Sequence, residues 1–511
     1  MSSAHRSLIP IAFTLLASTA IAADGIRVAT WNITYYDGTR AQEIGKVCYG
    51  EWNGKSMSPD VICLQEMLGR IPTLQFVQAM NEAPGSPGDW IAAPIYNDPR
   101  GGLQTALVYR TSKLEYIESE LISVGAGPPQ QPRNIVRFDM RAIGYNEDES
   151  IISFFPLHYK AGYTDSDLAR KLVESQIVRE HIETLPENRH VILGADLNIQ
   201  HSTDPAYEEL NGVVPNTGVL WDPISRPGTW NNNAAFRNLH TQDPTGGGGM
   251  DDRLDQILLS PSLLDGVGFE YDGKFESPWD LSTTEDPNHS YRAWGNDGTT
   301  YNQQLRASGN QMVGDEIAQA IKDMADPDGH IPVFLDLNVP PRIRVIGEHH
   351  DLGEVVHGMN PELVVRVGNG ADTQLWGPSG VATLQYHFET NAPIVVPDET
   401  FVSDAGIQLV THLISVESGA YGVPGEYRET VKLVSDDPAA PEYPILIEFQ
   451  IVGCNSADLV APLGQHTFTD VSAFISSFLN SDDAADIAEP HGVLNFFDVS
   501  AFLAAYVSGC D

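Results

Sequence analysis

The stretch VILGADLN, residues 191–198, joins an apolar run of strand length to two polar residues at its end. Its β-branched bias predicts a buried strand, so Asp196 and Asn198 fall at the strand end or in the loop that follows. The two residues are two positions apart, and in an extended chain both side chains leave the same face. Functional residues concentrate at such strand ends. An Asx-turn is the structural alternative for the same pair.

The same pattern recurs on both sides of this stretch. Five further apolar runs of strand length carry a polar residue at one end, and TALVYR is predicted to be an interior strand. The polar residues are Asn32 in VATWN, Glu66 in VICLQE, His158 in IISFFPLH, Asp255 in RLDQILLS and His330 in HIPVFLDL. Carboxamides, carboxylates and imidazoles gathered at one edge are the groups that a metal-assisted phosphodiester hydrolase requires.

Helical stretches alternate with these strands from residue 24 to residue 338. The clearest is DSDLARKLVESQIVREHIETL, residues 165–185, where Asp165, Ser166 and Asp167 are candidate caps. Its apolar residues recur with a helical period, which predicts that they form the buried stripe: Leu168, Leu172, Val173, Ile177, Val178, Ile182 and Leu185. A further helical run is predicted near Asp315 to Met324.

The first 22 residues combine an Arg-bearing start, an apolar run and an Ala-x-Ala end at Ala20 and Ala22. This predicts a signal peptide over residues 1–22 and a secreted or cell-surface protein. A transmembrane anchor is the alternative, but it needs about 20 apolar residues, and this run is shorter and interrupted by Ser and Thr. No later segment is long enough to span a bilayer, so we expect no transmembrane segment.

The pattern changes after Val339, where two consecutive prolines stop both helices and central strands. We therefore assign the catalytic domain to residues 23–338. Residues 339–453 hold short alternating strands separated by Gly, Pro, Asn and Asp turns, which predicts a small immunoglobulin-like β-sandwich.

Residues 454–511 contain an internal repeat, TDVSAFISSFLN and FDVSAFLAAYVS. Asp470 and Asp498 occupy the same position in the two copies, and each is predicted to cap a short apolar helix. The segment is therefore expected to be a small α-helical module of two loop-helix units.

Four cysteines in an exported chain predict one or two disulfides. Cys454 and Cys510 bracket the last module and are the expected pair, because a bond between them would clamp its two ends together. Cys63 lies inside an apolar strand, where a buried free thiol and a bridge to Cys48 are equal alternatives.

The chain is strongly acidic, with 29 Lys and Arg against 69 Asp and Glu and a net charge of −40. This composition does not support a broad basic surface for nucleic acid. A divalent cation would have to offset the repulsion of a phosphate locally. Solubility, for example in saline surroundings, is the simpler explanation of the charge.

Six motifs occur in a fixed order along residues 26–338: TWN, LQE, LHYK, GADLN, DRLDQILLS and GHIPVFLDL. In this set and order the segment resembles the endonuclease/exonuclease/phosphatase superfamily, the fold of secreted DNases, abasic-site nucleases, neutral sphingomyelinases and inositol polyphosphate phosphatases. The resemblance implies an α/β domain built as a four-layer α/β/β/α sandwich. It also implies hydrolysis of a phosphate ester by in-line attack of water.

The resemblance gives roles to individual residues. Asn32 and Glu66 resemble the family's ligands for Mg²⁺, with Mn²⁺ or Ca²⁺ as alternative ions. Asp196 would orient or deprotonate the attacking water, and Asn198 would bind phosphate oxygens. A turn residue at Asn32 and a surface carboxylate at Glu66 are the structural alternatives.

The basic side chains receive roles in the same way. His330 resembles the final catalytic histidine, with Asp255 orienting its ring, although a histidine on a strand is often only a packed residue. His158, together with Lys160, would contact the phosphate or protonate the leaving oxygen. Arg133 is the expected phosphate-binding arginine, and the neighbouring Arg137 and Arg141 are alternatives.

The chain departs from the family pattern at two positions. Gly329 precedes His330 where the family usually has Asp, so the site either loses one carboxylate or recruits Asp328 through the flexible glycine. Thr34 stands where some members place a second acidic residue after the WN motif. His289 imitates the last motif, but no apolar strand follows it, and we do not place it in the site.

The two-repeat end resembles dockerin modules, whose calcium loops supply oxygen ligands at fixed positions. Both loops, which begin at Asp458 and Asp486, are one residue too long for that pattern. The first has lost its ligands. The second retains oxygen-bearing side chains, so a calcium site and a metal-free loop are both open there: Asp486, Glu489, Asn495 and Asp498. The resemblance implies attachment to a cell-surface or cohesin-like receptor.

Taken together, the sequence predicts a secreted, metal-dependent phosphodiesterase, and in first place an extracellular endonuclease with DNA or RNA as substrate rather than as a stable partner. A phospholipid phosphodiesterase of the sphingomyelinase type is the main rival. It would need an exposed apolar hairpin for membrane contact, and we find none in the sequence. A binding protein that has kept the fold but lost turnover is the alternative from a different class.

Overall fold

The computed structural model describes residues 24–98, 102–212 and 218–510, so the predicted signal peptide at residues 1–22 lies outside the described residues. The chain forms two compact units. Unit 1 consists of Met1–Asp265 and Tyr271–Leu337, and unit 2 consists of Gly266–Glu270 and Asn338–Asp511.

Unit 1 contains two β-sheets. The first has the order β10-β12-β1-β2-β4-β3, with β11 also paired to β12. β1 and β2 run parallel, and β12 is antiparallel to β1 and β11, as β4 is to β2 and β3. The strands are β1 (Ile26–Tyr36), β2 (Val61–Met67), β3 (Trp90–Ala92), β4 (Gln104–Arg110), β10 (Glu270–Tyr271), β11 (Arg292–Ala293) and β12 (Val333–Asn338).

The second sheet has the order β5-β6-β7-β8-β9, in which only β7 and β8 pair in parallel. Its strands are β5 (Leu114–Ser123), β6 (Ile135–Ala142), β7 (Ile151–His158), β8 (His190–Asp196) and β9 (Asp255–Leu259). Every residue of β7, β8 and β9 is buried, as expected for strands covered on both faces.

The two sheets contact each other face to face through small residues. Gln65 of β2 donates from Nε2 to the carbonyl of Gly194 in β8, at 3.2 Å. A Cβ placed on Gly194 would lie 2.8 Å from the Cys63 Sγ atom. The glycine of the GADLN motif is therefore needed where β8 approaches the other sheet.

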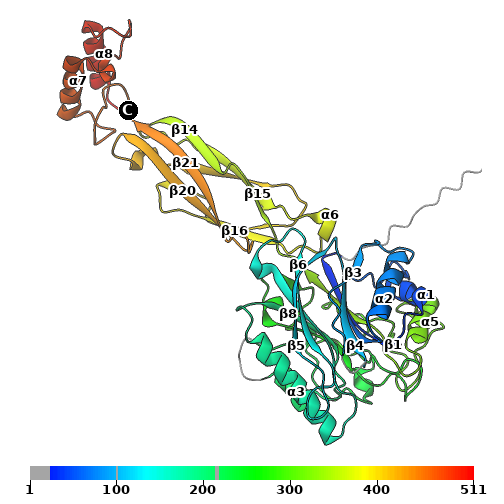
Figure 1. The fold of residues 1–511 in the computed structure, drawn as a ribbon. Coiled ribbons are helices and arrows are strands. Elements are labelled where there is room, and N and C mark those ends of the chain that lie inside the picture. The colour runs from blue at the N-terminus through cyan, green and yellow to red at the C-terminus, as the bar shows by residue number, and fades with distance from the viewer. Residues whose placement is uncertain (1–23, 99–101, 213–217, 511) are drawn as a thin grey trace, which may run out of the picture. The chain divides into compact units, whose positions relative to one another are not determined.

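Helices cover the outer sides of this pair of sheets (Figure 1). On the first sheet lie α1 (Ala41–Tyr49), α2 (Arg70–Glu82) and α5 (Gly314–Met324), and their buried side chains share one hydrophobic core with β1 and β2. On the other side lie α3 (Asp165–Ile182) and α4 (Pro205–Leu210). The predicted α/β class of this domain is confirmed.

Helix α3 corrects two sequence predictions. Its cap is Thr164, which forms a reciprocal capping box with Asp167. The predicted apolar stripe is only partly right, because Leu168 and Leu172 are half-buried while polar residues are buried. Arg170 and Lys171 bury their stems and donate to backbone carbonyl groups, a use of long basic side chains that a count of apolar positions does not detect.

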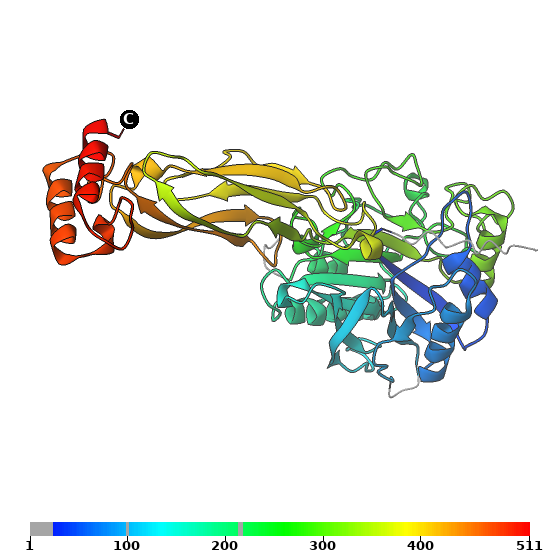
Figure 2. The same cartoon turned by 90° about the horizontal axis from the view of Figure 1, so that it is seen from above.

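Unit 2 begins with two sheets packed around one core (Figure 2). Their orders are β13-β15-β19-β17 and β14-β21-β20-β16-β18. The strands are β13 (Ile343–Ile346), β14 (His349–Val356), β15 (Glu362–Asn369), β16 (Leu384–Glu389), β17 (Ile394–Val395), β18 (Phe401–Ser403), β19 (Val410–Val416), β20 (Gly425–Ser435) and β21 (Glu442–Val452). A short helix, α6 (Thr373–Trp376), interrupts them.

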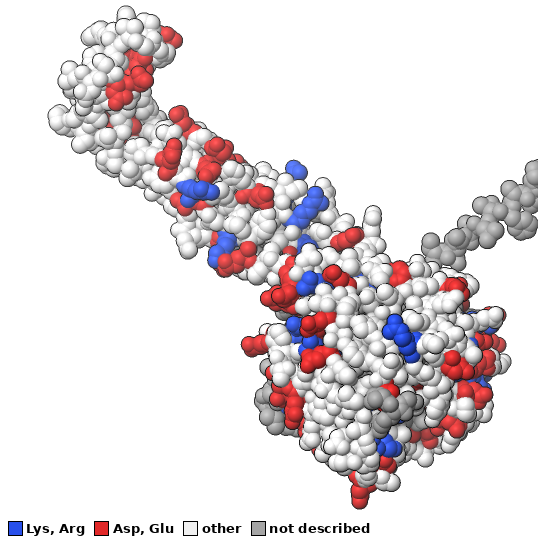
Figure 3. Space-filling model, in the orientation of Figure 1, with Lys and Arg blue, Asp and Glu red and all other residues white. Residues whose placement is uncertain are grey.

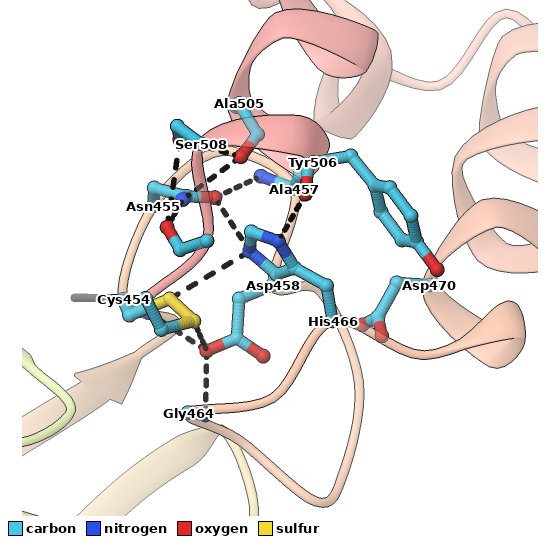
Figure 4. Close-up of a disulfide and its surroundings, with 12 residues drawn as sticks. Cys454, Asn455, Ala457, Asp458, Gly464, His466, Asp470, Ala505, Tyr506 and Ser508 are labelled. Carbon is cyan, nitrogen blue, oxygen red and sulfur yellow. Dashed lines mark hydrogen bonds between the residues drawn. A yellow bond between two sulfur atoms is a disulfide. The ribbon is translucent and has the colours of Figure 1, made fainter.

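The C-terminal module consists of α7 (Phe468–Asn480) and α8 (Phe496–Ser508) with the loops before them. Phe474 and Phe502 hold the same position in the two repeats and stack on each other, with ring centroids 4.1 Å apart. Cys454 and Cys510 form a disulfide beside Asp458 and His466 (Figure 4). Cys48 and Cys63 are both buried free thiols, so the alternative bridge between them is not formed. Among the described residues, no helix has the length and apolar character needed to cross a membrane.

Candidate functional site

Three neighbouring strands align the centre of the candidate site. In the parallel pair β7 and β8, His158 lies opposite Asp196, and in the antiparallel pair β8 and β9, Asp196 lies opposite Asp255. The three side chains therefore form a row across the end of the second sheet. All three are buried, with exposed fractions of 2% or less.

His330 joins this row from the segment before β12. Its Nδ1 atom lies 2.7 Å from Asp255 Oδ2, and its Nε2 atom lies 3.8 Å from Asp196 Oδ2. Thr241 also donates to Asp255 Oδ2, at 2.6 Å. The Asp255 carboxylate therefore fixes the orientation of the His330 ring, as a carboxylate beside an imidazole does.

The first sheet contributes Asn32 from within β1 and Glu66 from near the end of β2. Asn32 Nδ2 donates to Asp196 Oδ2 at 3.0 Å, while its Oδ1 accepts the backbone N–H of Thr34. Glu66 Oε1 lies 3.7 Å from His158 Nε2, and Glu66 Oε2 accepts the backbone N–H of Tyr35. The structure thus brings Asn32, Glu66, His158, Asp196, Asp255 and His330 together.

Asn198 lies beside this cluster in a left-handed backbone conformation, with φ of +50°. Its backbone N–H donates to Asp196 Oδ1 at 3.0 Å, which is the Asx-turn considered from the sequence. Because the turn uses Asp196 Oδ1, the other oxygen, Oδ2, faces Asn32 and the two histidines. The turn and a functional role are therefore compatible in one residue.

Part of the strained backbone of the described residues lies close to the cluster. Several residues other than glycine adopt positive φ here, and such conformations cost on the order of 1–3 kcal/mol each and persist where surrounding contacts enforce them. They are Thr34, Tyr35, Glu66, Asn198, Asp243 and Asp328.

The predicted phosphate-binding residues Arg133 and Lys160 contact groups next to the cluster and not its side chains. Arg133 donates from Nη1 to the carbonyl oxygens of His158 and Tyr159, both at 2.9 Å, so it supports the end of β7. Lys160 lies 3.0 Å from Asp167 at the start of α3. Of the alternatives to Arg133, Arg137 and Arg141 form ion pairs with acidic residues away from the cluster.

The two histidines differ in their electrostatics. Burial alone would lower the pKa of His330, but the carboxylates of Asp255, Asp196 and Glu66 outweigh it and raise that pKa to about 10. Burial, together with nearby Arg133 and His330, lowers the pKa of His158 well below its ordinary value of 6.5. At neutral pH, His330 is therefore an imidazolium and His158 a neutral imidazole.

The oxygen atoms of the cluster fit a hard divalent cation. Asp196, Asp255 and His330 each place one ligand atom within 4.8 Å of the others, which could hold a metal ion. Asp255 Oδ1 is buried and has no hydrogen-bond partner. Hard cations such as Mg²⁺ or Mn²⁺ prefer oxygen ligands, and the carboxylates and Asn32 supply them here.

Gly329 and Thr34, the two departures from the family pattern, lie against each other. A Cβ on Gly329 would fall 2.0 Å from Thr34 Oγ1 and 2.6 Å from the Ala325 carbonyl oxygen. Asp328 is not recruited into the cluster: its carboxylate lies against Gly246, and its backbone N–H donates to Thr245. In this backbone, no side chain fits at position 329.

Sequence reasoning missed Thr241 and Asp243. Asp243 donates its backbone N–H to the Gly329 carbonyl, and burial raises the pKa of its carboxyl to about 6 in spite of nearby His330. Both residues belong to an irregular segment that contains no apolar run, so no strand-end signal marks them. His289, which was left out of the site, is indeed elsewhere: it is buried and stacks on Tyr271 and Trp279.

The four candidate calcium ligands in the second loop are partly occupied by hydrogen bonds within the loop, and a calcium site there stays a prediction. Both oxygens of Asp498 accept backbone N–H groups, from Ile487 and Ala488 on Oδ1 and from Asn495 on Oδ2. Asp486 accepts the backbone N–H of Gly492, and the Glu489 side chain is exposed. Asp486 Oδ1 and the exposed Glu489 carboxylate remain available, which are fewer oxygen atoms than the six to eight that Ca²⁺ takes.

No family model and no curated protein sequence matches the chain. Solved structures similar to it include an endonuclease/exonuclease/phosphatase from Bacteroides vulgatus, at 14% identity over 61% of this chain and 98% of that chain, with a TM-score of 0.38. D. rerio TDP2 complexed with single strand DNA product shares 15% identity over 61% and 99%, with a TM-score of 0.36. The human Nocturnin catalytic domain with bound sulfate anion shares 12% over 62% and 95%, with a TM-score of 0.35. At these values, the roles of residues rest on the geometry of the site.

Proposed function

We propose that residues 23–338 form a metal-dependent phosphodiesterase of the endonuclease/exonuclease/phosphatase type. The observation that carries the proposal is the cluster itself. Asn32, His158 and His330 lie within 3.8 Å of Asp196 Oδ2, and Glu66 and Asp255 contact the two histidines. A structural core has no need to bury such a set of ionisable groups.

A bound divalent cation would polarise a phosphate oxygen and stabilise the charge that develops on it. Glu66 and Asn32 would hold this ion. The Asp196 carboxylate would orient the attacking water and accept its proton, since burial raises the pKa of Asp196. The His330 imidazolium would donate a hydrogen bond to a phosphate oxygen, and His158 would face the leaving oxygen, with Arg133 and Lys160 supporting that side.

For the substrate, we propose DNA or RNA cleaved by an extracellular endonuclease. The test is nicking of supercoiled DNA and cleavage of RNA with Mg²⁺, Mn²⁺ or Ca²⁺, with and without chelator. The expected result is metal-dependent cleavage that is lost in His158→Ala and in His330→Ala. A protein that hydrolyses no phosphodiester with any of these ions would instead be the non-catalytic binding protein.

A phospholipid phosphodiesterase of the sphingomyelinase type is the second candidate, and one observation favours it. Leu68, only two residues after Glu66, has an exposed side chain. Hydrolysis of sphingomyelin in vesicles, measured beside the DNA assay, separates the two substrates.

We also propose that the protein is exported with cleavage near Ala22, and that residues 339–453 and 454–511 are an immunoglobulin-like sandwich and a dockerin-like module. N-terminal sequencing of the mature protein tests the cleavage. For the module, we propose attachment to a cohesin-like receptor. Equivalent positions of its two repeats expose apolar side chains, which would suit such a contact: Phe468, Ile475 and Leu479 in α7, and Phe496, Leu503 and Val507 in α8. Replacing either triad by serines should weaken capture by a receptor.

A further inference from the structure

A second group of metal-ligating side chains lies in the C-terminal module. Cys454, His466 and Cys510 each place one ligand atom within 4.8 Å of the others. Cys454 and His466 precede α7 and Cys510 follows α8, and the disulfide joins the two cysteines (Figure 4). Asp458 belongs to the same group, because its Oδ2 atom lies 3.8 Å from Cys510 Sγ. We call these four residues the cysteine-histidine group.

The His466 ring is oriented with its Nε2 atom toward Cys454. Nδ1 lies 2.7 Å from the Tyr506 carbonyl oxygen, which can only accept a hydrogen bond, so Nδ1 carries the hydrogen. Nε2 of the neutral ring therefore presents a lone pair, and it lies 3.7 Å from Cys454 Sγ. The ring also stacks on Tyr506, with centroids 5.2 Å apart. Histidines that ligate metals are typically held in this way, by a hydrogen bond from the other ring nitrogen.

Acceptor atoms gather around this group. Asn455 donates from Nδ2 to two backbone carbonyl groups at the C-terminal end of α8, so its Oδ1 is the atom that lies 3.1 Å from His466 Nε2. Asp458 is 2% exposed, and its Oδ2 accepts the backbone N–H groups of Cys454 and Gly464. Its Oδ1 atom is buried and has no hydrogen-bond partner. Facing acceptors and a buried carboxylate oxygen form surroundings that favour a cation.

The module has no Lys or Arg that could balance the Asp458 carboxylate. Residues 454–511 contain eight Asp and Glu and neither Lys nor Arg. On the face shown in Figure 3, the module accordingly carries red acidic side chains and no blue basic ones. Buried charges in proteins are paired or coordinate metals. A metal ion is a cation that the ligands of the cysteine-histidine group can bind.

We propose that the module, when its disulfide is reduced, binds Zn²⁺ through the thiolates of Cys454 and Cys510 and through His466 Nε2. The Asp458 carboxylate would complete the set of four ligands. Thiolates and imidazoles are the ligands that zinc takes in four-coordinate sites. The ion needs both cysteines as thiolates, so zinc and the disulfide exclude each other. The two ends of the module would be held by a disulfide under oxidising conditions and by a zinc ion under reducing conditions.

The exchange between disulfide and zinc balances in two steps. A dithiol breaks the S–S bond by thiol-disulfide exchange: it becomes a disulfide itself, and its two hydrogen atoms pass to the sulfur atoms of Cys454 and Cys510. Zn²⁺ then displaces two protons, which are released to water, and binds the two thiolates. Oxidation of the thiolates by another disulfide reverses both steps and releases the ion.

The test uses the full chain, with Co²⁺ as a spectroscopic substitute for Zn²⁺. A trialkylphosphine reduces the disulfide, taking up the oxygen of water and leaving two thiols, and its excess is removed without air. Thiolate bound to Co²⁺ absorbs by charge transfer in the near ultraviolet, whereas oxygen ligands give no such band. The unreduced protein supplies the background, because Cys48 and Cys63 are free thiols there too.

The variant that tests the ligand set is His466→Ala. The matched control is His491→Ala, which removes an exposed histidine from the same module. Circular dichroism of the unreduced proteins checks that both variants fold, since the disulfide is then present in each.

We expect the charge-transfer band to appear only after reduction, to saturate at one ion per chain and to disappear when Zn²⁺ is added. His466→Ala should weaken the binding of Co²⁺, measured from this band, about tenfold or more, while His491→Ala stays within about twofold of wild type. Hydrogen exchange of α7 should speed up on reduction and slow again with Zn²⁺. Reduced wild-type protein without the band would overturn the proposal, and so would equal affinities of wild type and His466→Ala.

Discussion

Asp470 and Asp498 of the C-terminal module differ from Asp196 and Asp255 of the candidate site in what their carboxylates contact. In the module, Asp470 and Asp498 fill both carboxylate oxygens with backbone N–H groups from equivalent positions in the two repeats. In the cluster, Asp255 leaves a buried oxygen without a partner, and Asp196 faces two histidines. An aspartate saturated by the backbone holds a loop, and one with an open lone pair beside imidazoles is available for chemistry.

The largest effect should come from removing a carboxylate in the cluster. Asp196→Asn is expected to lower kcat for a soluble phosphodiester by about a thousandfold, because the acceptor for the proton of water is lost. The matched control is Asp498→Asn in the module, which should leave kcat unchanged. Similar losses in both variants would erase the distinction between the two kinds of aspartate.

A second effect concerns the protonation of the two histidines. In the metal-free protein, NMR titration should show His330 protonated until the pH approaches about 10, and His158 neutral down to a pH below 6.5. The raised pKa of His330 adds stability that is fully present below pH 6.5 and is lost as the pH rises through about 10. Protonation of His158 costs stability as the pH falls below 6.5. Titration of both rings near pH 6.5 would contradict this assignment.

The module should respond to loss of its own carboxylates. Asp470→Ala leaves the backbone N–H groups of Leu459, Val460 and Thr467 without their acceptor, which should cost about 1–3 kcal/mol of local stability. Hydrogen exchange of α7 measures the loss, and α3 in unit 1 serves as the internal reference. Unchanged hydrogen exchange in α7 would mean that the disulfide and the packing maintain the local stability of the module without the Asp470 carboxylate.

Gly329 offers a smaller test inside the cluster. Gly329→Asp is expected to destabilise unit 1 by about 1–3 kcal/mol and to restore no activity, since its Cβ meets Thr34 Oγ1 and the Ala325 carbonyl. Adding Thr34→Ala should relieve only part of the cost, because the backbone oxygen stays in place. Thermal unfolding measures both. A stable and more active Gly329→Asp protein would show that the loop can rearrange.

The smallest expected effect is that of calcium on the module. The second loop offers too few free oxygens, so Ca²⁺ should shift the unfolding temperature of the module by less than about 1 °C. Glu489→Gln should behave as wild type. A clear calcium-dependent shift, abolished by Asp486→Asn, would restore the alternative of a bound ion.

The sequence predicted site residues best where a polar residue ends an apolar run of strand length. The structure brings together the six polar residues found at the ends of apolar runs, while their catalytic roles stay predictions: Asn32, Glu66, His158, Asp196, Asp255 and His330. β1 nevertheless continues past Asn32 to Tyr36, and His330 lies before β12. The sequence did not reveal Thr241 and Asp243, because they lie in an irregular loop that is positioned by long-range contacts. The buried face of α3 was mispredicted because Arg170 and Lys171 bury their stems, which hydrophobic periodicity does not register. The exposure of Ile71 could not be foreseen, since which face of α2 packs inward depends on the sheet beneath it.

The stacking of Phe474 on Phe502 suggests that the two halves of the module can be connected in either sequence order. Each half of the module carries its own loop contacts, the two rings meet between the halves, and the Cα atoms of Cys454 and Cys510 lie 5.4 Å apart. Chain ends so close can be joined by a short linker, and new ends can be opened between the halves. A circular permutant in which the second half precedes the first should therefore fold into the same module. The order of the two halves along the chain would then not determine the fold of the module.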